Sequence, residues 1–226
     1  MGYGLGREWH LDYNFPKFKR VTQTLTLLKN VGMPYAILKF GSSFWNKVGF
    51  HNIGIDRWLD DYWYKFSKEE KERIIVSIAG TDFALEMLIE CLNDVCLNAA
   101  GIELNYSCPN VRDNKNRFTP KYISDRLPVY LKLNYLQDPY SYDLDCISGI
   151  RVNSVPKYFG GVSGKIAQKH NWEFIKKFNK EGLNVAGCSC VTMDDIYYME
   201  DLGCKEVGIG TVIIANPKLV EGLKCD

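Results

Sequence analysis

The chain has 226 residues, a length typical of one large domain, and 46% of them are apolar and 24% charged, as in globular proteins. The net charge of +1 gives no overall attraction for nucleic acid or for an anionic membrane surface. No apolar run approaches the ~20 residues of a membrane span, and the N-terminus lacks the regions of a secretory signal. We therefore expect one cytoplasmic domain over residues 1–226, without a membrane or nucleic-acid partner.

The eight cysteines are scattered along the chain, and no two of them form a Cys-x-x-Cys motif. Without an export signal, they are expected to be reduced thiols. Cys188 and Cys190 form a Cys-x-Cys pair, but no second cluster of ligands accompanies it, so the signal for a metal is weak. We predict no metal site.

In the first half of the chain, short apolar strands alternate with helices. The β-branched run 74–79 predicts a strand, and a helix is expected over 83–97 because its leucines recur on one face. A second strand is predicted over 101–105. A short helix over 120–126 and a third strand over 128–133 follow.

The second half continues the same alternation. A strand is predicted over 150–153, followed by a helix over 172–180 with its aromatic residues on one side. The next strand is expected over 183–186. A helix over 194–202 and a strand over 206–209 complete the pattern.

Strands that alternate with helices favour a parallel sheet covered by helices. The strands are short, and each ends in polar residues or glycine, which favours an α/β fold of the (β/α)8 TIM-barrel type. Neither the glycine-rich dinucleotide fingerprint nor the P-loop motif occurs, so the two other common α/β nucleotide folds lose their main support.

Polar residues and glycines follow the ends of these strands, where a barrel of this type builds its active site. They are Asn105, Cys108, Lys132, Asn153, Ser154, Gly187, Gly210 and Thr211. A face rich in amides, with one lysine and one thiol, suits a flat, anionic ligand that forms hydrogen bonds.

The run from Glu103 to Asn110 reads Glu-Leu-Asn-Tyr-Ser-Cys-Pro-Asn, and it resembles the active-site strand and loop of the class 1 dihydroorotate dehydrogenases. Other segments resemble further motifs of that family and occur in the same order. They are 46–56, 75–80, 152–154, 160–164 and 208–211.

The resemblance implies a (β/α)8 barrel with FMN at the carboxyl ends of its strands. The implied activity is the oxidation of dihydroorotate to orotate in pyrimidine biosynthesis. Cys108 would be the catalytic base that removes a proton from C5, while a hydride passes from C6 to the flavin. A thiol suits this role because its ordinary pKa of ~8.5 can be reached near neutral pH.

The resemblance also assigns ligand contacts. The cofactor side would comprise Lys132, Asn105, Gly161, Ser163, Gly164, Gly187, Gly210 and Thr211. The substrate side would comprise Asn46, Gly49, Phe50, Asn105, Asn110, Asn153 and Ser154. Amides can both donate and accept hydrogen bonds to a ring with alternating carbonyl and N–H groups, and glycines let backbone N–H groups reach a phosphate.

Three features depart from the family pattern. The family's chain begins well before the Gly-Tyr-Gly that starts here at Gly2, so we expect a barrel truncated at both ends that could lack its first strand. Gln23 stands where the family has a lysine close to flavin and substrate. Ser189 and its cysteine neighbours stand where the family has paired glycines near the phosphate.

Two other functions therefore stay open. The first is a catalytically inactive barrel that serves as a binding or assembly subunit. The second is a flavin reductase similar to the tRNA dihydrouridine synthases, whose motif resembles Asn-x-Gly-Cys-Pro, whereas Ser107 precedes the cysteine here. The resemblance further allows a homodimer, with dihydroorotate or orotate as the small-molecule partner.

Overall fold

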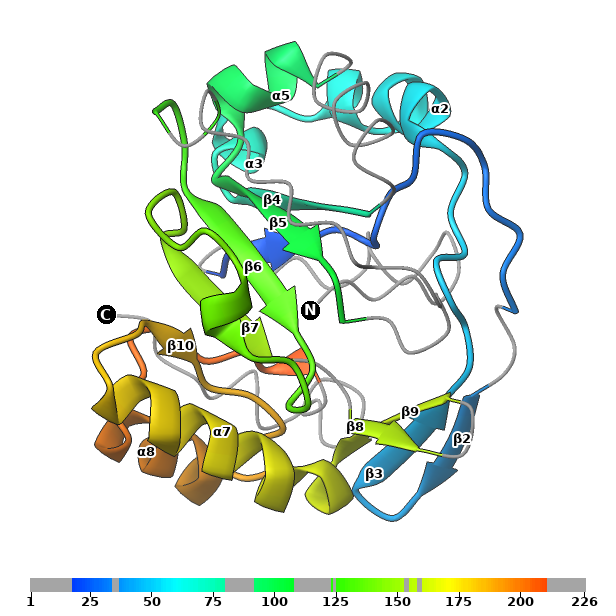
Figure 1. Cartoon of the computed structure of the whole chain (residues 1–226). Helices are drawn as coiled ribbons and strands as arrows, with labels where there is room; N and C mark the ends of the chain where they lie inside the picture. The colour runs from blue at the N-terminus through cyan, green and yellow to red at the C-terminus, as the bar shows by residue number, and fades with distance from the viewer. Residues whose placement is uncertain are drawn as a thin grey trace.

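Six parallel strands form the main sheet of the protein, in the order β1-β4-β5-β6-β7-β10 (Figure 1). Their bounds are Arg20–Val21 (β1), Ile74–Ile78 (β4), Gly101–Asn105 (β5), Val129–Leu133 (β6), Gly149–Val152 (β7) and Val185–Ala186 (β10). This computed structural model describes residues 18–33, 37–79, 92–107, 123, 125–152, 155–157 and 160–210.

The adjacent strands β4, β5 and β6 are buried at every position. Such continuous burial is typical of parallel strands that are covered on both faces. The sheet curls, and one further parallel pairing extends it beyond β10, where the N–H of Gly187 donates to the carbonyl of Glu206 (2.8 Å). The architecture is a partial (β/α)8 barrel, as the alternation of strands and helices predicted.

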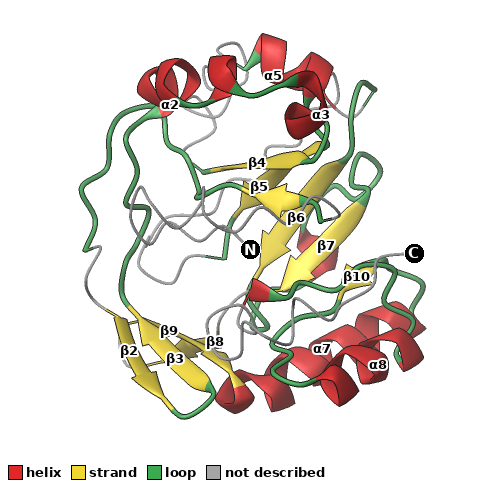
Figure 2. Cartoon of the chain, turned by 180° about the vertical axis from the view of Figure 1, so that it is seen from behind, coloured by secondary structure: helices red, strands yellow, loops and turns green. Residues whose placement is uncertain are grey.

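The helices lie at the two ends of the curled sheet (Figures 1 and 2). Next to β4 and β5 lie α2 (Ile55–Asp61), α3 (Lys68–Lys71) and α5 (Asn93–Asn98), and next to β10 lie α7 (Gln168–Lys180) and α8 (Met193–Asp201). Short 3-10 turns occupy Trp63–Lys65, Pro139–Ser141 and Lys165–Ala167. In the described part of the chain, no helix is long and apolar enough to cross a bilayer.

The packing of α7 follows from its pattern, because Phe174, Ile175 and Phe178 fall on its buried side and join the core beneath β10. The helix begins at Gln168, one turn before the predicted start. The N-terminus of α8 is fixed by a capping box in which the Thr192 hydroxyl accepts from the Asp195 N–H, while the Asp195 side chain reaches back to the N-cap.

A second sheet of four antiparallel strands was not predicted. Its order is β2-β3-β9-β8, with bounds Ile37–Phe40 (β2), Ser43–Asn46 (β3), Gly160–Gly164 (β9) and Val155–Lys157 (β8). The glycines of β9 let it approach β3 closely: a Cβ on Gly164, which has φ +83°, would lie 2.1 Å from the carbonyl oxygen of Ser42. The motif 160–164 thus has a structural reason for its glycines.

The strand predicted over 206–209 is wrong in its extent, since the structure has only the single bridge at Val207 there. The strand predicted over 183–186 is likewise reduced to Val185–Ala186. Most of the helices predicted over 83–97 and 120–126 falls outside the described residues; within them, α5 covers only Asn93–Asn98.

Candidate active site

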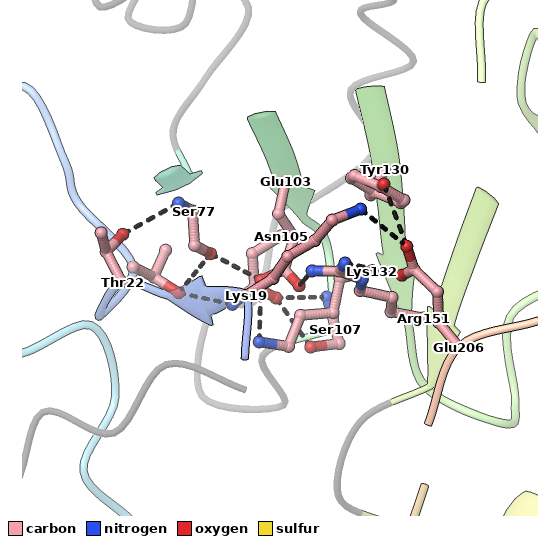
Figure 3. A network of polar contacts seen from close by, with 11 residues as sticks. Lys19, Thr22, Ser77, Glu103, Asn105, Ser107, Tyr130, Lys132, Arg151 and Glu206 are labelled. Carbon is pink, nitrogen blue, oxygen red and sulfur yellow. Dashed lines mark hydrogen bonds and ion pairs between the residues drawn. The ribbon is translucent and has the colours of Figure 1, made fainter. Parts of the chain in front are cut away.

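A buried ion pair lies inside the curled sheet, between β5 and β6. The Nζ atom of Lys132 is 3.0 Å from Oε1 of Glu103, and these two residues are 5% and 1% exposed (Figure 3). Strand alternation places Glu103 on the same face as Asn105. Asn105 in turn lies directly beside Lys132 in the parallel register. The predicted residues Asn105 and Lys132 are therefore brought together at the ends of neighbouring strands.

Glu103 is held by three donors. Besides Lys132, the Ser77 hydroxyl donates to Oε1 (2.7 Å), and Nη1 of Arg151 lies 3.4 Å from Oε2. Burial alone would raise the pKa of this carboxyl, but the nearby ammonium and guanidinium groups and the hydroxyl donor outweigh it. They lower the pKa of Glu103 to about 2. The carboxylate is therefore ionised at neutral pH and can only accept hydrogen bonds.

The low pKa of Glu103 predicts acid sensitivity. Its pKa falls from 4.5 to about 2 on folding, so the carboxylate contributes roughly 3 kcal/mol of stability. A depressed pKa means that this contribution is complete above about pH 4.5 and is lost as the pH falls towards 2. Urea unfolding measured between pH 3 and 7 should show the free energy of unfolding fall with pH. In the Glu103→Gln variant, the free energy of unfolding should depend less on pH. Identical profiles for the two proteins would contradict the assignment.

The side chain of Asn105 is fixed on both sides. Its Oδ1 accepts from the backbone N–H of Ser107 (3.1 Å) and from the Ser107 hydroxyl (2.7 Å), and its Nδ2 donates to Oγ1 of Thr24 (2.7 Å). The Thr24 hydroxyl lies 3.0 Å from that of Ser77. A continuous polar chain thus links Glu103 to Ser107, the residue directly before Cys108. Cys108 itself lies outside the described residues.

The network continues along the sheet, from β6 to β7 and on to the segment that pairs with Gly187. Nη2 of Arg151 is 3.1 Å from Oε2 of Glu206, and Nζ of Lys19 is 3.4 Å from Oε1 of the same carboxylate. Burial would raise the pKa of Glu206, but Arg151 and Lys19 lower it overall. The guanidinium of Arg151 also stacks over the ring of Tyr130, 4.0 Å from its centre. Because Lys19 precedes β1, these contacts connect the first and last parallel segments of the described sheet.

Apart from Gly187 and the buried Gly210, the remaining predicted residues divide into three groups. Asn46 and Gly161 are neighbours in the small sheet, where Nδ2 of Asn46 donates to the Gly161 carbonyl (3.4 Å); Ser163 and Gly164 follow along β9. Gly49, at φ +69°, precedes the buried Phe50, whose carbonyl accepts from the Asn52 amide (2.6 Å). The last group lies outside the described residues: Cys108, Asn110, Asn153, Ser154 and Thr211.

In the loop after β10, the side chains of Ser189 and its cysteine neighbours were expected to stand where a phosphate requires close contact with backbone N–H groups. In the structure these side chains turn towards the helices: the Ser189 hydroxyl accepts from Asn171 of α7 (2.9 Å), and Sγ of Cys190 faces the Asp195 carbonyl of α8 (3.6 Å). Ser189 has φ +61°. A residue with this left-handed backbone lets successive N–H groups form a concavity that suits an anion such as a phosphate.

The family profile of dihydroorotate dehydrogenase matches residues 12–127 of the chain, just over half of its length. The chain belongs to the dihydroorotate dehydrogenase family. It is 26% identical to the catalytic subunit of dihydroorotate dehydrogenase B (NAD(+)) from Caldicellulosiruptor bescii, over 98% of this chain and 85% of that protein. The corresponding subunit from Enterococcus faecalis is 24% identical over 98% of this chain and 83% of its own length.

Solved structures of the same family share the fold. The crystal structure of ligand-free dihydroorotate dehydrogenase from Eimeria tenella superposes with a TM-score of 0.65, at 15% identity, over 89% of this chain and 75% of that one. A complex of the Eimeria enzyme with ferulenol gives a TM-score of 0.63 at 16% identity. At this identity the likeness bears on the fold alone, and it agrees with the partial barrel.

In this family member, the buried cysteines are poor candidates for chemistry. Burial raises the pKa of Cys188 to about 12 and that of Cys204 to about 11, so both thiols stay protonated at neutral pH. Across the part of the chain that the structure describes, no three potential metal-ligating side chains gather into one group.

Gly187 is required by packing. Both of its backbone groups pair with the segment around Val207, and a Cβ on it would lie 2.7 Å from Cγ and 2.8 Å from Cβ of Met199 in α8. Gly187→Ala should therefore lower the free energy of unfolding by about 1–3 kcal/mol through overpacking. Chemical denaturation tests this. An unchanged free energy of unfolding would show that Met199 and α8 can shift to make room for the added methyl group.

Sequence reasoning missed the residues that hold Lys132 and Asn105 in place. Glu103, Ser77 and Thr24 were not assigned roles. One signal was available: a lysine inside a buried strand requires an anion, and Glu103 lies on the adjacent strand, two positions before Asn105, and hence on the same face.

Proposed function

We propose that this protein oxidises dihydroorotate to orotate with bound FMN. The observation that carries the proposal is the juxtaposition of a buried cation, Lys132, and a fixed amide, Asn105, at the strand ends next to Ser107, which precedes Cys108 in the sequence. A flat ring with acceptor atoms along its edge matches such a pair of donors. The family assignment supports the same reading.

The proposed roles follow from this placement. Lys132 and Asn105 would bind the pyrimidine edge of the flavin, and the backbone of the Ser189 loop would bind its phosphate. Asn46, Asn105, Asn110, Asn153 and Ser154 would orient the substrate ring, together with the backbone of Gly49 and Phe50. The predicted cofactor contacts of Gly161, Ser163, Gly164, Gly187, Gly210 and Thr211 belong to the same proposal.

Cys108 would act as the base. Its thiolate sulfur takes the proton from C5 of dihydroorotate, so that the C5–H bond breaks as the ring double bond forms. When bound, FMN supplies the acceptor for the hydride that leaves C6. The ammonium of Lys132 stabilises negative charge that develops at the strand ends, because a fixed charge in a buried site requires little reorganisation.

Flavin content and substrate binding test the proposal directly. The purified chain should show the visible absorbance band of bound flavin, either as isolated or after incubation with FMN. Orotate should perturb that band, and dihydroorotate should reduce an artificial dye in the presence of the protein. Failure to bind FMN after reconstitution, with no dye reduction, would favour the inactive assembly subunit. Light scattering of the same sample tests the predicted homodimer.

A further inference from the structure

Backbone pairing holds the last parallel segment of the described barrel on one side only. The Gly187 N–H donates to the carbonyl of Glu206, and the Gly208 N–H donates to that of Gly187, both at 2.8 Å. On its other side, within the described part of the chain, the segment pairs with no strand. Two bonds to one residue fix the position of the segment at that residue better than they fix the direction of the chain beyond it.

The side chain of Glu206 supplies contacts that the backbone lacks (Figure 3). Its Oε2 lies 3.1 Å from Nη2 of Arg151 in β7, and its Oε1 accepts from the Tyr130 hydroxyl of β6 (3.3 Å). Nζ of Lys19, which precedes β1, lies 3.4 Å from the same Oε1. Three donors from three segments therefore hold one carboxylate, and Lys19 links it to the side on which no strand pairs.

Arg151 gives this anchor a fixed position. Its side chain is 14% exposed, its guanidinium stacks over Tyr130, and its Nη1 lies 3.4 Å from Oε2 of Glu103. A planar guanidinium that contacts two carboxylates and a ring at once has few alternative arrangements. The carboxylate of Glu206 is thus tied to the buried network around Glu103 rather than to mobile surface groups.

The segment that Glu206 anchors leads through Gly208 to Gly210. Its carboxyl end lies beside that of β10, where Ser189 has φ +61°. In barrels of this type, the loops after the seventh and eighth strands frequently form a phosphate site. Backbone N–H groups must point at a phosphate to bind it, because hydrogen bonds weaken steeply as their angle departs from linearity. The direction of this segment therefore matters for such a ligand.

We propose that Glu206 is a positioning residue: its carboxylate closes the unpaired side of the barrel and so fixes the segment up to Gly210 for a ligand that carries a phosphate. The chemical class is a phosphate monoester, such as the phosphate end of FMN. This inference rests on the proposed function and goes beyond it, because none of the predicted cofactor contacts explains how a partial barrel holds its last segment in place.

The test compares FMN with riboflavin, which has the same ring and ribityl chain but no phosphate, by calorimetric titration of the full chain. Glu206→Ala should weaken FMN binding by about tenfold, the scale of one lost hydrogen bond to a charged group, but riboflavin binding by no more than about twofold. A purely structural role would weaken both alike. Glu206→Gln keeps the size of the side chain and one oxygen acceptor, so it should give a smaller change of the same kind, and it decides the question if the alanine variant does not fold.

Two further variants and a second measurement complete the test. Arg151→Met removes the contact with Glu206 from the other side and should lower the FMN-to-riboflavin affinity ratio too. Glu181→Ala is the matched control, because this carboxylate also accepts from a tyrosine hydroxyl, that of Tyr140 (3.0 Å), but lies at the C-terminal end of α7. Hydrogen exchange of the Gly208 N–H, followed by NMR without flavin, should be faster in Glu206→Ala than in the control.

Each result decides between the alternatives. An affinity ratio that falls in Glu206→Ala and Arg151→Met but not in Glu181→Ala, with faster exchange at Gly208, supports the inference. Equal losses of FMN and riboflavin affinity in Glu206→Ala, a similar fall of the ratio in the control, or unchanged exchange at Gly208 overturns it while leaving the proposed function intact. If the wild type binds neither flavin, the proposed function fails and this inference fails with it.

Discussion

Glu103→Gln should lower the free energy of unfolding at pH 7 by about 3–5 kcal/mol, the range found when one partner of a buried ion pair is removed. The substitution keeps the size of the side chain but removes its charge. Lys132, 5% exposed, and the mostly buried Arg151 would then face each other without the carboxylate between them. Urea denaturation gives the value directly.

An exposed ion pair provides the control. Arg57 and Asp61 lie one turn apart in α2 with a 3.0 Å contact, and their side chains are 57% and 40% exposed. Asp61→Asn should cost less than about 1 kcal/mol, since water screens such a pair. Equal losses in Glu103→Gln and Asp61→Asn would mean that the network around Glu103 is far more hydrated than its burial indicates.

The coupling between Glu103 and Lys132 can be separated from general damage by a double-mutant cycle. Lys132→Met alone should destabilise the protein, because it removes one of the two cations that compensate the Glu103 charge. In the Glu103→Gln background the same substitution should cost less or even stabilise, since an apolar side chain then replaces an uncompensated ammonium. Additive losses would show that the two side chains do not depend on each other.

The parts of the fold that the sequence predicted well are those in which local pattern and final environment agree. The strand over 101–105 has the predicted bounds, and all five of its positions are buried, including the polar Glu103 and Asn105. The helix α7 was recognised by the spacing of its aromatic residues. In both cases the information lies within one segment of the chain.

The parts that were missed depend on contacts between distant segments. The small sheet joins β3 to β9, and it pairs Asn46 with Gly161, which lies more than a hundred positions later in the chain. The Gly160–Gly164 motif has little strand propensity, so nothing local indicated a sheet. The polar network around Glu103 and Lys132 was missed for a similar reason: Glu103, Arg151 and Ser77 come from three different strands.

Cys108→Ala should reduce dihydroorotate oxidation by about 100- to 10,000-fold, the range typical for the loss of a general base, while FMN binding is retained. The expectation follows from the place of Ser107, which Asn105 holds at the carboxyl end of β5 through two hydrogen bonds. Ser107 is thus held beside Asn105, the neighbour of Lys132, one position before Cys108 in the sequence. Cys146→Ala is the matched control, because that half-buried thiol precedes β7 and so lies at the opposite ends of the strands.

The Cys108→Ser variant distinguishes a cysteine that acts as the catalytic base from one with a merely structural role. Cys108→Ser keeps a small polar side chain, but a hydroxyl loses its proton much less readily than a thiol with a pKa of ~8.5. The variant should retain a small activity that rises with pH beyond the point at which the wild type levels off. Stopped-flow reduction of the bound flavin by dihydroorotate, measured across pH, reports this step alone. A pH profile shared by the serine variant and the wild type would remove Cys108 from the role of base, because the titrating group would then lie elsewhere in the site.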